Sequence, residues 1–139
     1  MLQYHGTNRI AGQAITNNQI DVAIGGGELG RGFYTGDLKH EAFTWAHQIY
    51  GAANKSVVEI DIIDDEFFHI DPLCLNYREA LNYRRIIRDR QESRTFLFDS
   101  NAVWSPVVGK YIPNFNQIKW ESEQSENFLN SIQVTKFLY

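Results

Sequence analysis

The chain has 139 residues, a length that fits one domain whose single core buries roughly two-thirds of the surface exposed by the unfolded chain. Its hydrophobic fraction of 43% and charged fraction of 22% are typical of globular proteins and exclude an intrinsically disordered chain. The net charge of −4 speaks against global attraction to nucleic acid, but not against a local basic patch.

We expect no targeting signal from the pattern of the sequence. No apolar run approaches the ~20 residues that a membrane-spanning helix needs. The N-terminus starts directly as a strand, without a basic segment followed by an apolar one, so we expect no secretory signal. Cys74 is a single cysteine and has no partner for an intrachain disulfide. We therefore expect a protein of the cytoplasm, either of the producing cell or of a target cell, that does not contact a membrane.

The first quarter of the chain reads as two short strands around a glycine-rich loop. A strand is predicted over Leu2–Tyr4, followed by a loop or short helix over Asn8–Asn18. Four glycines lie among residues 24–30, and glycine adopts positive φ at little steric cost, so this segment is expected to be a flexible flap. Phe33–Thr35 is the second predicted strand.

A helix and a clear strand come next. Asp37 is a plausible N-cap for a helix over Leu38–Tyr50. In Lys55–Ile63, apolar residues alternate with Glu59 and Asp61, which predicts a strand with one buried face. Phe67–Ile70 reads as a further strand.

The C-terminal half alternates helices with short strands. Its predicted elements are a helix over Asn76–Glu92 whose apolar face includes Leu73, Tyr77, Ala80, Leu81 and Ile87, one or two strands in Asn101–Ile112 broken at Pro106, a strand over Asn116–Trp120, a short helix over Ser122–Leu129 and a strand over Ile132–Leu138. Strands dominate, and no linker or repeat divides the chain. The sequence therefore predicts one α+β domain, residues 1–139, with a split, mostly antiparallel sheet and two or three packed helices.

Two short motifs carry the functional signal. The first motif ends the first predicted strand and reads Tyr4-His5-Gly6-Thr7. The second motif follows about thirty residues later, leads into the second predicted strand and reads Gly30-Arg31-Gly32-Phe33-Tyr34-Thr35. A helix that contains Trp45 follows. This order and spacing resemble the NAD-binding half of the ADP-ribosyltransferase superfamily, on its poly(ADP-ribose) polymerase and diphtheria-toxin side. That branch is marked by a His, a Tyr and a third polar residue, usually Glu.

The resemblance implies a role for each residue of the first motif. His5 would donate to a hydroxyl of the adenosine ribose, and the backbone of Gly6 would bond the carboxamide of nicotinamide. Thr7 matches a hydroxyl position that contacts the same region. The NAD-binding set implied by the resemblance is His5, Gly6, Thr7, Arg9, Gly32, Phe33, Tyr34 and Trp45, with NAD as co-substrate and no metal. Taken alone, His5 would read as an ordinary histidine at the end of a strand.

Aromatic side chains are expected to hold the nicotinamide. Tyr34 matches the family tyrosine that stacks on the positively charged ring, an attraction of about 0.5–2 kcal/mol. Trp45 falls where relatives place a second aromatic residue. The alternative readings are a half-buried strand residue for Tyr34 and a core residue of an amphipathic helix for Trp45.

The third motif position is assigned to Gln117, at the start of the predicted strand Asn116–Trp120. A glutamine can hydrogen-bond a ribose hydroxyl, but it lacks the charge that stabilises an oxocarbenium ion. Glu121 lies on the same strand face about 13 Å away, too far to serve the same ribose. If Glu121 or Glu123 were the functional acid, the chain would belong to the ordinary Glu-bearing group. The catalytic set implied by the resemblance is therefore His5, Tyr34 and Gln117.

A basic helical stretch is the remaining candidate site. Six of the thirteen basic residues lie between positions 78 and 94, and Arg78, Arg84, Arg85 and Arg88 are candidates for contacting an anionic acceptor. The alternative is a solvated helix face. We expect this stretch to lie far from the NAD cleft.

The function implied by the resemblance is that of an NAD-dependent mono-ADP-ribosyltransferase acting on a protein or nucleic acid. Small relatives are often bacterial or phage toxins, which implies a toxin or effector with an antitoxin or immunity protein as partner. The alternatives are an NAD glycohydrolase and a non-catalytic NAD-binding module. An RNA 2′-phosphotransferase, which shares the superfamily fold, ranks low because it normally needs several basic residues in the cleft.

Overall fold

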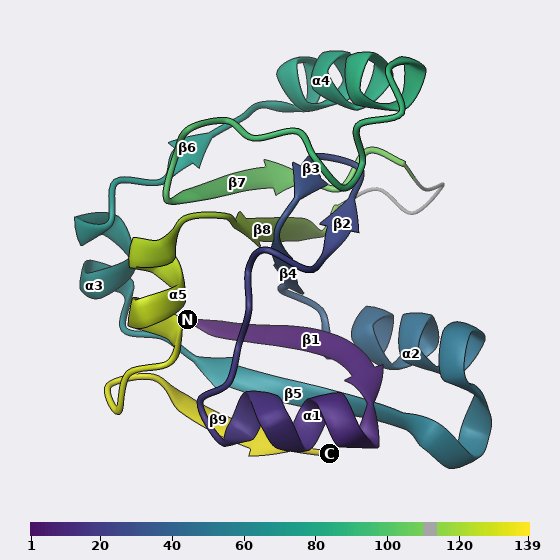
Figure 1. The fold of residues 1–139 in the computed structure, drawn as a ribbon, viewed down its shortest axis with the longest axis vertical. Coiled ribbons are helices and arrows are strands. Elements are labelled where there is room, and N and C mark those ends of the chain that lie inside the picture. The colour runs from purple at the N-terminus through teal and green to yellow at the C-terminus, as the bar shows by residue number, and fades with distance from the viewer. Residues whose placement is uncertain (110–113) are drawn as a thin grey trace.

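A seven-stranded sheet forms the frame of the molecule, with the strand order β6-β7-β8-β4-β1-β5-β9 (Figure 1). The structure, a computed structural model, describes residues 1–109 and 114–139. The strands are β1 (Leu2–Asn8), β2 (Gly26–Gly27), β3 (Gly30–Arg31), β4 (Phe33–Gly36), β5 (Lys55–Asp61), β6 (Leu73–Cys74), β7 (Ala102–Pro106), β8 (Asn116–Trp120) and β9 (Thr135–Leu138). The helices are α1 (Arg9–Thr16), α2 (Lys39–Asn54), α3 (Asp64–His69), α4 (Tyr77–Asp89) and α5 (Glu123–Leu129). The predicted α+β class with a mostly antiparallel sheet is confirmed, but the described residues form five helices instead of two or three.

The sheet is divided into two halves that meet at a narrow contact. One half contains β1, β5 and β9, and the other contains β6, β7, β8 and β4. Within the described residues, β1 and β4 pair at a single position, Tyr4 opposite Gly36. In Figure 1 the two halves lie one below the other, with α4 above the upper half and α1 and α2 beside the lower half. The sheet is therefore open between the end of β1 and the beginning of β4.

Helices α1 and α2 cover opposite faces of the lower half-sheet. A Cβ atom added to Gly6 would meet the backbone carbonyl of Ala42 in α2, so α2 lies directly on the face to which Gly6 belongs. A Cβ added to Gly12 of α1 would lie 3.6 Å from Thr7 Cγ2. Neighbouring residues of a strand face opposite sides of the sheet, so α2 packs on the side of Gly6 and α1 on the side of Thr7. No helix among the described residues is both long and apolar enough to cross a membrane.

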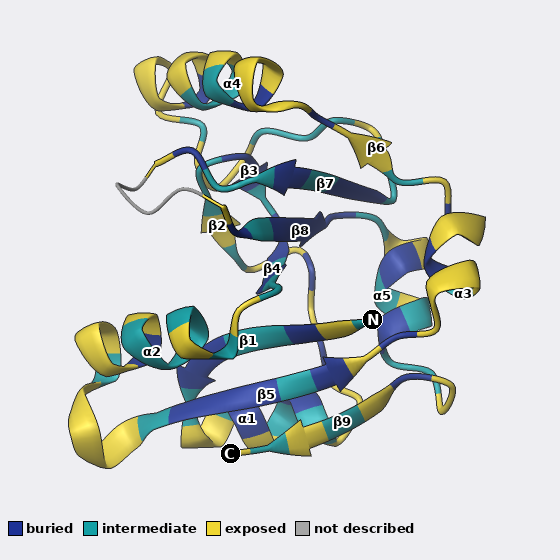
Figure 2. Ribbon diagram, turned by 180° about the vertical axis from the view of Figure 1, so that it is seen from behind, coloured by how far each residue is buried: buried dark blue, intermediate teal, exposed yellow. Residues whose placement is uncertain are grey.

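The main core includes residues of β5 and β8, and Figure 2 shows both strands largely in the colour of buried residues. Val58, Ile60 and Ile62 are all fully buried, which confirms the buried face expected for this strand. They belong to a cluster with Trp120 of β8 and Leu129 of α5. A second cluster, around Leu29, Leu75, Ala80, Val103 and Val108, joins α4 to β7 and the glycine-rich segment.

The strand predicted over Phe67–Ile70 is wrong, because this segment is mostly the helix α3. Three acidic residues, Asp64 to Glu66, occupy its first turn, where they complement the partial positive charge of a helix N-terminus. Phe67 is buried with its ring 5.7 Å from that of Trp120. Phe67 in the helix and Ile70 just after it are therefore buried, whereas Phe68 is exposed, which is the pattern of a short helix packed by one side.

Asp37 does not cap α2. The helix begins at Lys39 after Leu38, which makes no side-chain cap bond, and it extends to Asn54 across a kink at Gly51, where φ is 77°. The carboxylate of Asp37 instead accepts hydrogen bonds from the backbone N and the Nδ2 of Asn116, each over 3.0 Å. Asp37 thereby fastens the end of β4 to the beginning of β8.

The glycine-rich segment is a docked hairpin. Gly26 pairs with Arg31 and Gly27 with Gly30, which leaves Glu28 and Leu29 as a two-residue turn. The backbone N of Gly27 donates to Ser93 O over 3.0 Å. The hairpin is therefore fastened to the loop after α4, where a free flap was expected.

Other boundaries differ by a few residues. Of the predicted strand Asn101–Ile112, Ala102–Pro106 is β7, while positions 110–112 lie outside the described residues. Asn8 caps a helix, α1, by accepting a hydrogen bond from the backbone N of Ala11, which settles the loop-or-helix alternative there. In the apolar set assigned to the α4 region, Ala80 and Ile87 are buried, whereas Tyr77 is 58% exposed and Leu73 belongs to β6.

Candidate functional site

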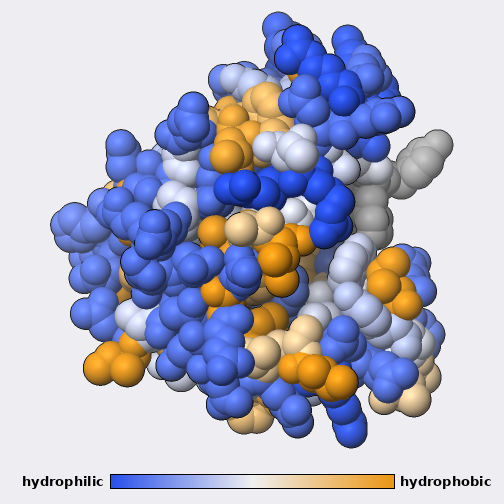
Figure 3. Space-filling view, viewed as in Figure 1, coloured by the Kyte–Doolittle hydropathy of each residue, from blue (hydrophilic) through white to orange (hydrophobic). Residues whose placement is uncertain are grey.

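A cavity of about 760 Å³ opens where the two half-sheets separate, and its volume is within the ~300–1,000 Å³ typical of small-molecule sites. Figure 3 shows the middle of this face hollowed beside a group of apolar side chains, with hydrophilic side chains above it over α4. The expected residues that line the cavity are His5, Gly6, Thr7, Gly32, Phe33, Tyr34, Trp45 and Gln117. Arg9 is the exception: it is exposed at the start of α1 and does not line the cavity.

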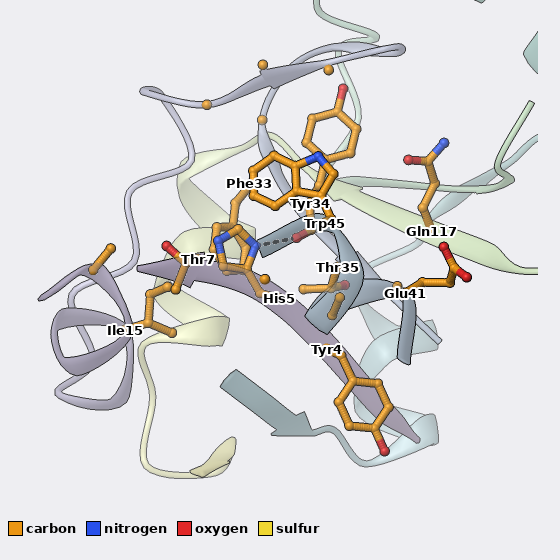
Figure 4. Close-up of a pocket in the computed structure, with 18 of the residues that line it drawn as sticks. Tyr4, His5, Thr7, Ile15, Phe33, Tyr34, Thr35, Glu41, Trp45 and Gln117 are labelled. Carbon is orange, nitrogen blue, oxygen red and sulfur yellow. Dashed lines mark hydrogen bonds between the residues drawn. The ribbon is translucent and has the colours of Figure 1, made fainter. Parts of the chain in front are cut away.

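His5 is held by two contacts from β4 (Figure 4). Its Nδ1 donates to the backbone carbonyl of Tyr34 over 2.7 Å, and its ring stacks on Phe33 with centroids 4.3 Å apart. Burial lowers the pKa of His5, and the bond to the Tyr34 carbonyl opposes this shift in part. In the neutral ring with Nδ1 protonated, Nε2 is an acceptor. This tautomer makes Nε2 an acceptor for a ligand, whereas the resemblance implied that His5 donates to a ribose hydroxyl.

The backbone of Gly6 points into the opening between the half-sheets. Gly6 lies opposite Val57 of β5, and Val57 exchanges both of its backbone hydrogen bonds with Tyr139 on its other side. Along an antiparallel pair of strands, residues that exchange two backbone hydrogen bonds with the partner strand alternate with residues whose N–H and C=O point away from it. The N–H and C=O of Gly6 are therefore directed away from β5, toward β4. A donor and an acceptor at one residue match the two polar groups of a carboxamide.

The hydroxyl of Tyr34 is held by the hairpin that β2 and β3 form. Its hydroxyl donates to Gly30 O over 2.6 Å and accepts from the backbone N of Leu29 over 3.2 Å. A Cβ added to Gly27 would lie 2.7 Å from Cζ of the ring, so Gly27 lets the hairpin lie against the aromatic face. Burial is the main cause that raises the pKa of Tyr34. The ring is therefore neutral and rigidly placed, as a stacking platform requires.

Trp45 of α2 is a cavity residue and not a core residue. Its side chain is 40% exposed and lines the cavity, and its ring meets that of Tyr50 edge-on at 6.1 Å. In Figure 4 the rings of Trp45 and Tyr34 overlap in the view, and Gln117 is drawn to their right. The core interpretation of Trp45 is therefore wrong, and an exposed aromatic surface is available to a ligand.

Gln117 lies on β8 opposite Gly36 and is 8% exposed. Its Nε2 donates to Oε1 of Glu28 over 2.6 Å. The same Oε1 accepts from the backbone N of Val108 over 3.0 Å, and Oε2 lies 3.4 Å from Nε of Arg84. Glu28 is a cavity residue that the sequence reasoning missed. Its one signal was an acidic residue that interrupts the glycine run.

The other candidate acids lie elsewhere. The carboxylate of Glu121 is buried, 2.7 Å from the fully buried Lys119 Nζ, and it accepts from the backbone N atoms of Phe98 and Asp99. Glu121 and Glu123 line a separate cavity that shares no residue with the one around Gln117. Glu121 thus pins the segment before β7 to β8, a structural role.

The basic stretch reaches the cavity, contrary to expectation. Arg84 and Arg94 both line it. Arg84 pairs with Glu28, and Nη2 of Arg94 donates to Ile24 O over 2.6 Å. Arg78, Arg85 and Arg88 are exposed, and Arg88 pairs with Asp89 at 3.5 Å. The first two guanidinium groups therefore support the wall of the cavity, and the other three face solvent.

No model of a known protein family matches the chain, and no curated protein matches it. In the described part of the chain, no group of three or more His, Cys, Asp and Glu side chains could hold a metal ion. A function must therefore be argued from the cavity and from the residues that line it.

Proposed function

We propose that the chain is an NAD-dependent mono-ADP-ribosyltransferase that breaks the bond between nicotinamide and ribose and transfers ADP-ribose to a macromolecular acceptor. One observation supports this most directly. His5, Tyr34 and Gln117, from three strands and far apart in the sequence, line a single cavity at the opening of a split sheet. The resemblance implies that these three residues act together.

The nicotinamide end of NAD would lie between the aromatic rings and the backbone of Gly6. Tyr34 offers a fixed ring and Trp45 an exposed one, and a cationic nicotinamide is attracted to both faces. The N–H and C=O of Gly6 would bond the carboxamide. His5 Nε2 would accept from a hydroxyl of the adenosine ribose.

The chemistry requires stabilisation of positive charge on the ribose. The nicotinamide–ribose bond breaks with its electron pair moving to the nicotinamide nitrogen, which leaves neutral nicotinamide and an oxocarbenium-like sugar. A nucleophile of the acceptor then bonds the anomeric carbon and loses its proton. Gln117 Oε1 would accept from the 2′-hydroxyl of this ribose, and such preorganised contacts act most strongly where charge develops.

The two arginines of the cavity bear on the 2′-phosphotransferase alternative. That reaction calls for basic groups in the cleft, and Arg84 and Arg94 are present there. Both guanidinium groups already bond the protein, to Glu28 and to the Ile24 carbonyl. The 2′-phosphotransferase activity is therefore the less favoured proposal, and transfer of ADP-ribose is the favoured one. Loss of phosphate from a 2′-phosphorylated RNA in the presence of NAD would instead favour the 2′-phosphotransferase.

The biological setting that fits the proposal is a toxin or effector that acts in a cytoplasm. NAD is available there, and the exposed free Cys74 is compatible with reducing conditions. An antitoxin or immunity protein would be the natural partner. The exposed arginines Arg78, Arg85 and Arg88 would help bind an anionic acceptor.

The test uses NAD labelled in its adenosine portion, incubated with the purified protein and cell extract. Labelled protein or nucleic acid, recovered and identified by mass spectrometry, is the expected result. Release of free ADP-ribose with no labelled acceptor would indicate a glycohydrolase. Binding of NAD without nicotinamide release in any extract would reject the enzyme in favour of a binding module.

A further inference from the structure

Glu28 places a carboxylate in the cavity beside the one motif position where a carboxylate is missing. It lies in the two-residue turn between β2 and β3, next to Leu29, which is fully buried. Gln117 Nε2 and Val108 N both donate to its Oε1, and Arg84 faces its Oε2. The side chain is 16% exposed. Groups from β8, α4 and the segment after β7 thus fix one acidic side chain of the hairpin.

We propose that Glu28 is the positioning residue for Gln117, and that the two side chains divide the work done elsewhere by a single glutamate. This inference rests on the proposed function. In it, Gln117 accepts the hydrogen bond of the ribose hydroxyl, and Glu28 supplies the negative charge next to it.

The direction of the hydrogen bond follows from the chemistry of the two groups. An ionised carboxylate accepts hydrogen bonds and cannot donate them, whereas an amide does both. Glu28 therefore selects the amide orientation in which Nε2 faces the carboxylate, and Oε1 is left as the acceptor for a ligand. A hydrogen bond to a charged acceptor is about twice as strong as a neutral one. An amide that could otherwise turn over is held in the useful orientation.

The wall around Glu28 explains how the charge is kept in place. Arg84 Nε lies 3.4 Å from Oε2 of Glu28 and presents the opposite charge to this carboxylate. A second carboxylate at position 117 would stand where Nε2 now lies, 2.6 Å from Glu28 Oε1. Two carboxyl groups so close cannot both ionise, and one pKa of such a pair rises.

The first experiment measures nicotinamide release by four variants. Glu28→Ala should lower kcat about 10²-fold, as for the loss of a preorganised contact, with little change in KM for NAD. Glu28→Gln keeps an acceptor for Nε2 but loses the charge, so its kcat should lie between that of the wild type and that of Glu28→Ala. Gln117→Glu alone should be slow, and Glu28→Gln/Gln117→Glu should recover activity because a carboxylate and an amide again face each other. Glu123→Gln, an exposed change on α5, is the matched control.

Recovery in the exchanged pair is a result that a merely structural role would not give. If Glu28→Ala kept the kcat of the wild type while Gln117→Ala was inactive, the inference would fail and the proposed function would stand. Failure of the wild type itself to release nicotinamide would reject the proposed function.

The hydrogen bond has a readout that needs no turnover. In a ¹⁵N NMR spectrum, the side-chain amide signals that disappear in Gln117→Ala belong to Gln117. They should move in Glu28→Gln and stay in place in Glu123→Gln. Unmoved Gln117 signals in Glu28→Gln and in Glu28→Ala, with both variants folded, would overturn the inference.

Discussion

His5 and Tyr34 are joined by a side-chain hydrogen bond at the point where the backbone pairing of their strands ends. Tyr4 still pairs with Gly36, but directly after Tyr4 the backbone pairing with β4 ends. There the Nδ1 of His5 donates to the Tyr34 carbonyl over 2.7 Å. The two motif residues thus fix each other and keep the two halves of the sheet in register across the opening.

The hydroxyl of Tyr34 and its ring should be separable by mutation. Tyr34→Phe removes two hydrogen bonds to the hairpin but keeps the aromatic face, so it should lower the free energy of unfolding by about 1–3 kcal/mol and retain NAD binding. Tyr34→Ala should abolish NAD binding as well. Urea denaturation and calorimetric titration with NAD check this, and equal NAD affinity of Tyr34→Ala and Tyr34→Phe would contradict it.

The lowered pKa of the partly buried His5 should make stability depend on pH. Burial lowers the pKa of His5 in the folded protein, so the unfolded chain takes up this proton first as the pH falls below about 6.5. The free energy of unfolding should therefore decrease in that window. His5→Asn should show a smaller decrease between about pH 7 and pH 5 than the wild type. His40→Asn, at an exposed histidine of α2, is the control, and equal slopes for the wild type and His5→Asn would reject the explanation.

The buried pair of Lys119 and Glu121 should matter for folding and not for turnover. Glu121→Ala leaves Lys119 Nζ, 0% exposed, without its carboxylate and should cost about 3–5 kcal/mol of stability. Replacing both residues, as Lys119→Met/Glu121→Gln, should restore much of this. Glu123→Ala should change stability by no more than about 0.5 kcal/mol. Normal stability of Glu121→Ala in denaturant would contradict the assignment, and inactivity of a fully folded Glu121→Ala would return Glu121 to the candidate site.

Local patterns predicted most of the elements but not the contacts between them. The alternation of Val58, Ile60 and Ile62 identified β5 because a two-residue period reports burial directly. Phe67 gave no such signal, since in α3 a single buried aromatic residue anchors six residues. Asp37 followed a valid capping rule, yet its carboxylate is used by Asn116, a partner 79 positions away.

The residues of the candidate site, too, were predicted from the sequence only where a local motif contains them. His5, Tyr34 and Gln117 were found because their motifs are contiguous strings with a recognisable order. Glu28 was not named at all, and Arg84 was named only for a surface expected far from the cavity, because both positions depend on a hairpin and a helix that meet at β8. The bond from Gln117 to Glu28 spans 89 positions, and no spacing rule addresses such a pair.

Expression of the intact protein should be toxic if the proposed chemistry proceeds in a cell. Strong induction in a bacterial host should slow growth, because NAD is consumed or an acceptor is modified. His5→Ala should relieve the effect, with the exposed change His40→Ala as control. Growth curves and cellular NAD levels measure the outcome, and equal growth of the wild type and His5→Ala would remove the support for a toxin.

The most direct measurement is nicotinamide release from NAD by the purified wild type and its three motif variants, with cell extract as acceptor. The account predicts release by the wild type and its loss in His5→Ala and Tyr34→Ala. It also predicts a fall of about 10²–10³-fold in Gln117→Ala, with a much smaller change in NAD affinity. No release by the wild type, or equal release by all four proteins, would contradict it.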